Sequence, residues 1–533
     1  MRARIRMHEG NRKWWTLAAM CFALFMIMLD NTVVNVALPS IQRDLHASIS
    51  SLEWTVNAYT LTFAVLLVTG GRMGDIFGRR TMFLFGVVAF ALSSAFIGFA
   101  PSQTILVIGR AVQGVGAAFM MPGTLSIISD AFPPHERGRA IGTWAGVSGL
   151  ALAIGPVVGG ALTEYVSWRA IFFLNLPVAA GAVAVTLFAA RNSRDETVDR
   201  TVDLPGIAAL SVGLTGLVLA LIEANRWGWG SARIVGLFAA AAVGLVAFVL
   251  IETHRRVPMV DFSFFKSRTF LGANLVAIVI SFAMLAQFFF MALYMQNILH
   301  FSALGAGVRF LPSTLMIVVI APIAGRLADR IGPKPLMLVG LALIGASLFL
   351  QQRIDDSSGY TTLLPAFVLL GVGIALTMSP MSTAAMNAVR VTKAGVASGV
   401  LSMSRMVGGS LGVAVTGALF QNLFANRVNQ LVDGTALAKW PRGQMFEAVS
   451  SGQTAHIANG ATKAQAAELT HVARDSFIHA LAGSMRLSLG VVVVGLVAAG
   501  FLIQGRGLPA RKPGDRPVEE IRPEAVAEPL GAQ

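Results

Sequence analysis

Asp30 is the residue whose type and position most clearly indicate chemistry. It lies in the stretch 29–39, Leu-Asp-Asn-Thr-Val-Val-Asn-Val-Ala-Leu-Pro, which ends a long apolar run that begins near Trp14. A carboxylate in lipid costs about 2.5 kcal/mol or more, so such residues are usually retained for a function. Burial favours the protonated carboxylate and a nearby cation favours the ionised one, so a cation whose distance changes between conformations could make Asp30 a proton carrier. The alternative is a fixed polar contact between packed helices.

The composition places these residues in a membrane. The chain has 533 residues, of which 55% are hydrophobic and 13% charged, and its mean hydropathy is +0.69. A soluble protein carries about 25% charged residues. Apolar runs longer than about 18 residues recur along the chain and indicate spanning helices. Open sheet edges cannot be satisfied in lipid, and the alternating pattern of a barrel is absent. Cys21 is the only cysteine, so no intramolecular disulfide is expected.

The apolar runs predict fourteen membrane spans, at about 14–38, 54–71, 81–100, 104–126, 140–162, 169–190, 204–222, 233–251, 269–297, 304–324, 335–351, 362–385, 395–420 and 483–503. Loops on one side hold 27 Lys and Arg residues, whereas the short loops on the other side hold 5. Because basic residues favour the cytoplasmic side, we expect both termini in the cytoplasm. The net charge of +14 then reflects topology, and no nucleic-acid partner is expected.

A repeated loop divides the chain into two related halves. Gly71-Arg-Met-Gly-Asp-Ile-Phe-Gly-Arg-Arg80 matches Gly325-Arg-Leu-Ala-Asp-Arg-Ile-Gly-Pro-Lys334 in its glycines, aspartates and basic residues. Parallel six-helix repeats are a known transporter architecture. We therefore expect an all-α polytopic membrane protein with six-helix bundles at 1–190 and 269–504, an inserted helix pair with linkers at 191–268, and a disordered cytoplasmic tail at 505–533. The 421–482 segment is predicted to be an outer loop with amphipathic helices at 444–449 and 463–478, which caps or tethers the last two spans.

Arg110 in the fourth span is the predicted partner of Asp30. Asp30 lies about 12 Å below the end of its span near residue 38, and Arg110 lies about 9 Å below residue 104, at 1.5 Å per residue. The two side chains are therefore expected at similar depth, with Gln113 one turn deeper. Alternatively, Arg110 extends to the outer surface.

The repeated loop is predicted to form a gate. Asp75 near a helix N-terminus, together with basic residues near carboxylates, can latch the two halves at their cytoplasmic ends. A plain positively charged loop would explain the arginines but not the glycines and aspartates that recur in the second copy. The expected gating residues are Gly71, Asp75, Gly78, Arg79, Arg80 and Asp329.

Other polar and small residues within the spans give less specific expectations. Arg405, at mid-depth of the thirteenth span, needs a carbonyl or carboxylate partner that the sequence does not identify. Small residues of the fifth span allow close approach of a neighbouring helix and weaken its backbone ladder; they are Gly155, Pro156, Gly159 and Gly160. The candidates for a central substrate cavity are Asn35, Asn57, Tyr59, Gln113, Gln287 and Gln296.

Five stretches together resemble the major facilitator superfamily, in particular its fourteen-span drug:proton antiporter family (EmrB/QacA type). They are 29–39, 71–80, Arg110-Ala-Val-Gln-Gly-Val-Gly116, Gly155-Pro-Val-Val-Gly-Gly160 and Trp168-Arg-Ala-Ile-Phe-Phe-Leu-Asn-Leu-Pro177. The resemblance implies the major facilitator fold, a role in proton transfer for Arg110 and antiport for the glycine–proline motif. It further implies a monomer in a bacterial inner (plasma) membrane that exports lipophilic, cationic or amphipathic small molecules in exchange for protons.

Two alternatives remain open at this point. Within transporters, the chain could export one endogenous antibiotic, metabolite or lipid. From another class, it could be a polytopic membrane enzyme or receptor, but the spans contain no nucleophile–base or metal-ligand pattern and the tails are too short for a signalling domain. We therefore expect no enzymatic activity, no metal and no cofactor; the expected partners are a small-molecule substrate, protons and the lipid bilayer.

Overall fold

The computed structural model describes residues 9–45, 49–194, 203–255, 258, 260, 262–355, 358–432 and 463–504. Over these residues the chain is helical and contains no β-strand. The predicted tail at 505–533 and the predicted helix at 444–449 lie outside the described residues.

The first half of the chain forms one helical bundle. Its helices are α1 (Glu9–Leu45), α2 (Ile49–Phe77), α3 (Arg79–Gly98), α4 (Gln103–Ala131), α5 (Pro134–Tyr165), α6 (Ala170–Phe173) and α7 (Asn175–Ala189). The expected sixth span is thus two helices, α6 and α7, that meet at Leu174. Between α2 and α3 the chain turns at Gly78, whose φ of 104° lies in a region that disfavours other residues.

The second half forms a matching bundle, and two further helices lie between the halves in sequence. The inserted pair is α8 (Leu204–Trp227) and α9 (Ala232–His254), followed by the 3₁₀ turn η1 (Phe262–Lys266). The second bundle contains α10 (Arg268–Leu293), the π turn η2 (Tyr294–Ile298), α11 (Ala303–Arg309), α12 (Leu311–Ile331), α13 (Pro333–Gln351), α14 (Tyr360–Asn387), the 3₁₀ turn η3 (Val391–Lys393), α15 (Ala394–Val432) and α18 (Lys463–Leu502).

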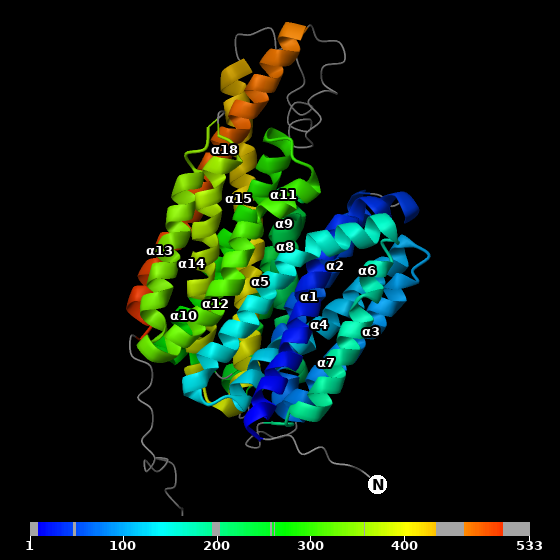
Figure 1. The fold of residues 1–533 in the computed structure, drawn as a ribbon, viewed down its shortest axis with the longest axis vertical. Coiled ribbons are helices and arrows are strands. Elements are labelled where there is room, and N and C mark those ends of the chain that lie inside the picture. The colour runs from blue at the N-terminus through cyan, green and yellow to red at the C-terminus, as the bar shows by residue number, and fades with distance from the viewer. Residues whose placement is uncertain are drawn as a thin grey trace, which may run out of the picture.

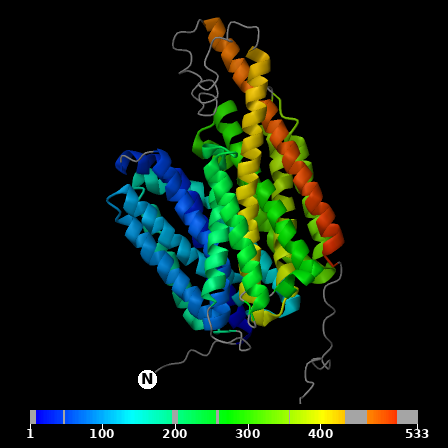
Figure 2. The same cartoon turned by 180° about the vertical axis from the view of Figure 1, so that it is seen from behind.

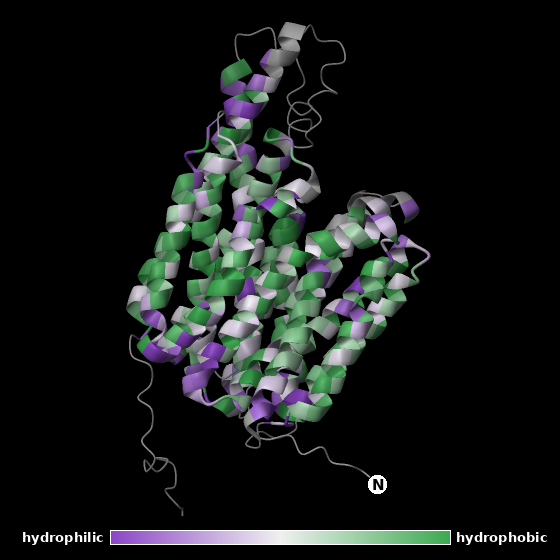
Figure 3. Cartoon of the chain, viewed as in Figure 1, coloured by the Kyte–Doolittle hydropathy of each residue, from purple (hydrophilic) through white to green (hydrophobic). Residues whose placement is uncertain are grey.

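Thirteen helical segments among the described residues are long and apolar enough to cross a membrane. The 32-residue helix α5 is not among them, but it runs through the bundle between α1 and α12 and supplies the remaining predicted span. Hydrophobic residues cover the middle of the bundle, and hydrophilic residues gather near the face where α1 begins and α18 ends (Figure 3). We call this the terminal face. The chain is a multi-pass membrane protein with the predicted all-helical fold.

The two halves pack most closely near the terminal face and diverge toward the opposite face (Figure 1). Across the seam α5 packs along α12, and α2 packs along α15. The inserted helix α8 contacts both α2 and α15, whereas α9 packs chiefly on α8. The inserted pair therefore lies over the seam between the bundles.

Two helices of the second half continue beyond the bundle on the opposite face. The helix α15 is 39 residues long and α18 is 40, about twice what a membrane requires. Their ends form the projection at the top of Figure 1, seen from behind in Figure 2. In its described parts the expected 421–482 loop is therefore a continuation of two spanning helices, and the predicted helix at 463–478 is the first part of α18.

Candidate functional site: a buried carboxylate and two interhalf latches

Asp30 lies inside the first bundle with no exposed surface. Its Oδ2 accepts a hydrogen bond from Arg110 Nη1 at 2.6 Å, and the Arg110 side chain is 1% exposed. The pairing predicted from depth is therefore present, and Arg110 does not extend to the surface. The arginine is held further by Nε, which donates to the Thr55 carbonyl at 3.0 Å, and by the Tyr59 ring, whose centroid lies 4.3 Å from its Cζ.

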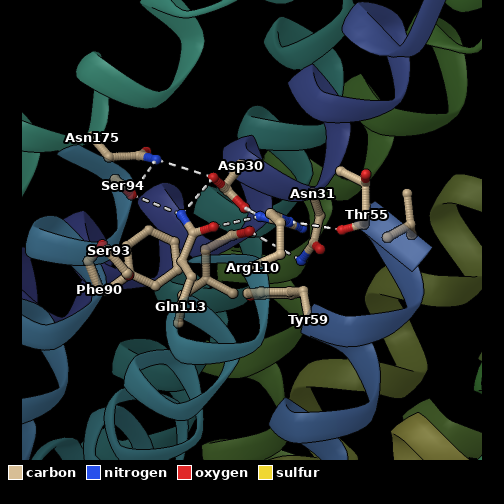
Figure 4. Close-up of polar contacts among 12 residues, drawn as sticks. Asp30, Asn31, Thr55, Tyr59, Phe90, Ser93, Ser94, Arg110, Gln113 and Asn175 are labelled. Atoms are coloured by element: carbon tan, nitrogen blue, oxygen red, sulfur yellow. Dashed lines mark hydrogen bonds and ion pairs between the residues drawn. The ribbon is translucent and has the colours of Figure 1, made fainter. Parts of the chain in front are cut away.

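Three neutral side chains complete this buried network (Figure 4). Gln113 Nε2 donates to Asp30 Oδ1 at 2.9 Å, and Gln113 Oε1 accepts from Arg110 Nη1 at 2.6 Å. Asn175 Nδ2, at the start of α7, donates to the same Asp30 oxygen at 3.0 Å. Ser94 Oγ accepts from both Gln113 and Asn175, at 2.7 and 3.2 Å. Buried charges are tolerated where every lone pair has such a donor.

Asn175 and Ser94 were not predicted as site residues. Asn175 lies in the quoted 168–177 stretch, and a polar side chain within a span was the available signal. Ser94 gives no comparable signal, because serine in a membrane helix can satisfy itself on its own backbone. Asn175 reaches Asp30, and Ser94 reaches Gln113 and Asn175, only after α7 is packed against α1 and α3 against α4.

Close packing of α5 on α1 fixes the helix turn that follows Asp30. A Cβ on Gly155 would lie 1.8 Å from Thr32 Oγ1, and one on Gly159 would lie 2.9 Å from Val33 Cα. The expected close approach at these glycines is therefore present, and the approaching helix is α1. The side chain of Pro156 lies outside the described residues, and Gly160 is partly exposed.

The substrate candidates occupy different environments. Tyr59, Gln113 and Gln287 are 1%, 0% and 0% exposed, so none is open to solvent in this conformation. Asn57 is partly exposed, Gln296 in η2 is exposed, and the side chain of Asn35 is outside the described residues. Gln287 donates weakly to Ser347 at 3.5 Å, and its Oε1 has no partner among the described residues. Their roles as cavity residues remain predictions.

Asp75 joins the two halves at the terminal face. Its carboxylate accepts from the backbone N–H groups of Gly395 and Val396, at 3.1 and 2.9 Å, and so caps the N-terminus of α15. Arg79 Nε donates to Asp75 at 2.9 Å, while Arg79 Nη2 donates to the carbonyls of Val391 and Thr392, at 2.5 and 2.7 Å. A carboxylate at a helix N-terminus is favourable because of the unpaired N–H groups there.

Asp329 makes the corresponding contact in the second repeat. It accepts from the backbone N–H groups of Gly138 and Arg139, at 2.9 and 3.0 Å, near the start of α5. Each half thus contributes one carboxylate and one receiving helix. We call the contacts of Asp75 and Asp329 the two latches.

Glycines allow the latch helices to touch. A Cβ on Gly71 would lie 2.3 Å from the Gly395 carbonyl oxygen, and one on Gly325 would lie 1.9 Å from that of Gly138. The recurrence of glycine at these two loop positions therefore has a steric reason. Arg80 donates to the carbonyls of Ala190 and Leu187 within the first half, and Gly78 lies against Asn192. Neither contact joins the halves, and gating roles for Arg80 and Gly78 remain predictions.

The family follows from comparison with known sequences. Residues 20–413 match the sequence profile of the Major Facilitator Superfamily. The chain belongs to this superfamily. A Tetracenomycin C resistance and export protein of Streptomyces glaucescens is 36% identical over 92% of this chain and 91% of its own length. The Puromycin resistance protein pur8 of Streptomyces alboniger is 35% identical over 96% and 95% of the two chains.

More distant relatives and solved structures agree with this assignment. The Multidrug transporter protein MdtP of Bacillus subtilis is 31% identical over 80% of each chain. The proton:xylose symporter XylE superposes with a TM-score of 0.59 at 14% identity, over 94% of this chain and 98% of its own. The human organic anion transporter MFSD10 gives 0.58 at 13% identity, over 93% and 100%. Both solved structures are similar in fold to this chain. The family and the names of the sequence relatives favour a transporter over an enzyme or a receptor.

Proposed function

We propose that this major facilitator superfamily protein exports lipophilic small molecules in exchange for protons, with its terminal face in the cytoplasm of a bacterium. The names of its relatives support export and drug resistance. The excess of basic residues in the loops of the terminal face supports the orientation. The observation that carries the proton coupling is the fully buried Asp30, whose partners all come from one half of the molecule.

In the proposed cycle, Asp30 alternates between an ionised form paired with Arg110 and a protonated form. Protonation removes the negative partner of the buried Arg110, and leaving that charge unpaired costs free energy unless the helices rearrange. Protonation from the outer side therefore favours a different packing of α1 against α4. Release of the proton to the cytoplasm restores the pair and completes one exchange.

The two latches are the proposed cytoplasmic gate of this cycle. They hold α15 on α2 and α5 on α12 at the terminal face, which supports a gate that is closed at this face, the one we assign to the cytoplasm. Rocking of the halves breaks the Asp75 and Asp329 contacts together and opens a central site to the cytoplasm. The protein acts as a monomer, since each bundle finds its partner within the chain.

Two substrate ranges fit this mechanism. Relatives named as multidrug transporters support a broad set of lipophilic compounds. A relative of 36% identity named for resistance to and export of tetracenomycin C supports a dedicated exporter of one antibiotic.

Reconstitution in liposomes tests the coupling. Wild-type protein and Asp30→Asn are compared for puromycin and ethidium movement driven by an imposed proton gradient, with internal pH followed by a dye. Asp44→Asn is the matched control, because Asp44 is half exposed and pairs with Arg169 at the opposite face. We expect gradient-driven movement in wild type and the control and none in Asp30→Asn. Equal movement by all three proteins overturns the role of Asp30.

A further inference from the structure

Arg405 is a partly buried cation of α15 that faces the first half of the molecule. Ser398, seven residues earlier on α15, donates to the carbonyl of Pro122 in α4 at 2.7 Å. Residues seven apart lie on the same face of a helix, so Arg405 belongs to the stripe of α15 that meets the first bundle. Its Cζ accordingly lies 5.8 Å from the centroid of the Trp144 ring in α5.

Both side chains lie within the membrane-spanning part of the seam. Arg405 lies ten residues inside the predicted span 395–420, and Trp144 lies four residues inside the predicted span 140–162. At 1.5 Å per residue these positions are about 15 and 6 Å from the terminal-face end of each span. Substrate sites in transporters of this architecture lie between the two repeats.

Arg405 has no anionic partner within the described part of the chain. Its Nε and Nη2 atoms are buried and make no hydrogen bond there. The helices α10, α14 and α15 contain no acidic residue at all. Two buried acids of the first half are already engaged: Asp30 with Arg110, and Asp75 with Arg79 and the start of α15. The arginine is always protonated, so the seam carries a positive charge.

The unpaired polar groups beside Arg405 are neutral and do not balance its charge. Trp144 is fully buried, and its indole N–H has no hydrogen-bond partner among the described residues. The hydroxyl of Ser402, one turn before Arg405, is likewise buried without a partner there. A cation–π contact recovers only part of what burying a guanidinium costs. An unpaired ionisable group inside a membrane is by default a functional site.

We propose that Arg405 and Trp144 bind an anionic group of the substrate, such as the carboxylate or ionised phenol of an aromatic compound. This inference rests on the proposed export function and names its substrate class. It departs from the expectation of cationic or amphipathic substrates that the family resemblance implied. Asp30 is already neutralised by Arg110, whereas the charge of Arg405 is free for a ligand. The aromatic ring of Trp144 supplies an apolar surface beside that charge.

Two dyes with the same ring system and opposite charge test the proposal. Fluorescein is an anion and tetramethylrhodamine methyl ester is a cation, and binding of each to purified protein in nanodiscs is measured by fluorescence polarisation. We expect Arg405→Gln to weaken fluorescein binding about ten- to a hundredfold, the usual effect of losing a charge-assisted hydrogen bond. Arg405→Lys retains the charge and should restore most of it. The matched control is Arg486→Gln, which removes an exposed arginine of α18.

The outcomes separate this proposal from the export function. Selective loss of fluorescein binding in Arg405→Gln, with rhodamine binding unchanged, supports the anion site, as does a smaller loss in Trp144→Phe. Failure of the wild type to bind fluorescein, or equal weakening of both dyes in Arg405→Gln, overturns it. Dye movement driven by a proton gradient is then measured with the same protein in liposomes. Movement that Arg405→Gln leaves intact for both dyes overturns the anion site but leaves export standing. Export itself is overturned if the gradient moves neither dye and neither puromycin nor ethidium in wild type.

Discussion

Replacing Asp75 by Asn removes a charge from the first latch while keeping the shape of the side chain. The carboxylate accepts from two backbone N–H groups and from Arg79, and an amide retains one of the two acceptor oxygens. One charge-assisted bond contributes about 1.5–3 kcal/mol, and the charge at the start of α15 about 0.3–1 kcal/mol more. The loss is about 3 kcal/mol in all, which shifts the population of the open latch roughly a hundredfold.

Thiol labelling measures this shift. In a Cys21→Ala background the chain has no native cysteine, and Ser398→Cys introduces one on the stripe of α15 that is buried against α4. We expect N-ethylmaleimide to modify this thiol much faster when Asp75→Asn is added. Asp44→Asn, at the opposite face, should leave the rate unchanged. If Asp75→Asn is labelled at the rate of its parent and melts at the same temperature, the latch does not hold the halves together.

Three further changes test other contacts. Gly71→Ala places a Cβ 2.3 Å from a carbonyl oxygen of the other half. Such overpacking costs about 1–3 kcal/mol, so labelling at Ser398→Cys should accelerate. Gly181→Ala is the control, because nothing lies within 4 Å of its new Cβ, and the labelling rate should stay the same. Cys21 in the unaltered chain is buried, and we expect mass spectrometry to find it unmodified by N-ethylmaleimide unless the protein is denatured. Asp475→Asn breaks an ion pair with Arg427 in which both side chains are about one-third exposed. The free energy of unfolding should therefore fall by less than about 1 kcal/mol. A change in Tm larger than that of a typical surface substitution would contradict this.

The spans and the central ion pair follow from the sequence by simple physics. Hydropathy predicts where the spanning helices lie along the chain, and the distribution of basic residues predicts which of their ends face the cytoplasm. Depth along each helix then pairs Asp30 with Arg110, because these two charges share one level and a buried charge requires a partner. A separate signal, the recurrence of the 71–80 loop in the second repeat, indicated Asp75 as a contact between the halves.

The remaining contacts depend on how the helices are rotated and which helices are neighbours. Depth gives one coordinate for each residue, so it does not reveal that Asn175 reaches Asp30 across 145 positions. It also does not reveal that Asp75 ends on α15, about 320 residues away. Arg80 shows the limit of composition, because its charge resembles that of Arg79 while its bonds stay within one half. These choices are made by packing between helices.

The extensions of α15 and α18 beyond the bundle would amplify any rotation of the second half into a larger displacement at their ends. Both helices belong to the second half, and Arg427 joins them to each other through Asp475 at 2.7 Å. At 1.5 Å per residue the 39 residues of α15 extend about 58 Å. A tilt of the second half by a few degrees is therefore magnified at the far end of this helix pair. A pair of spin labels, one near residue 430 and one on the end of α3, would turn a small rocking motion into a large change of distance.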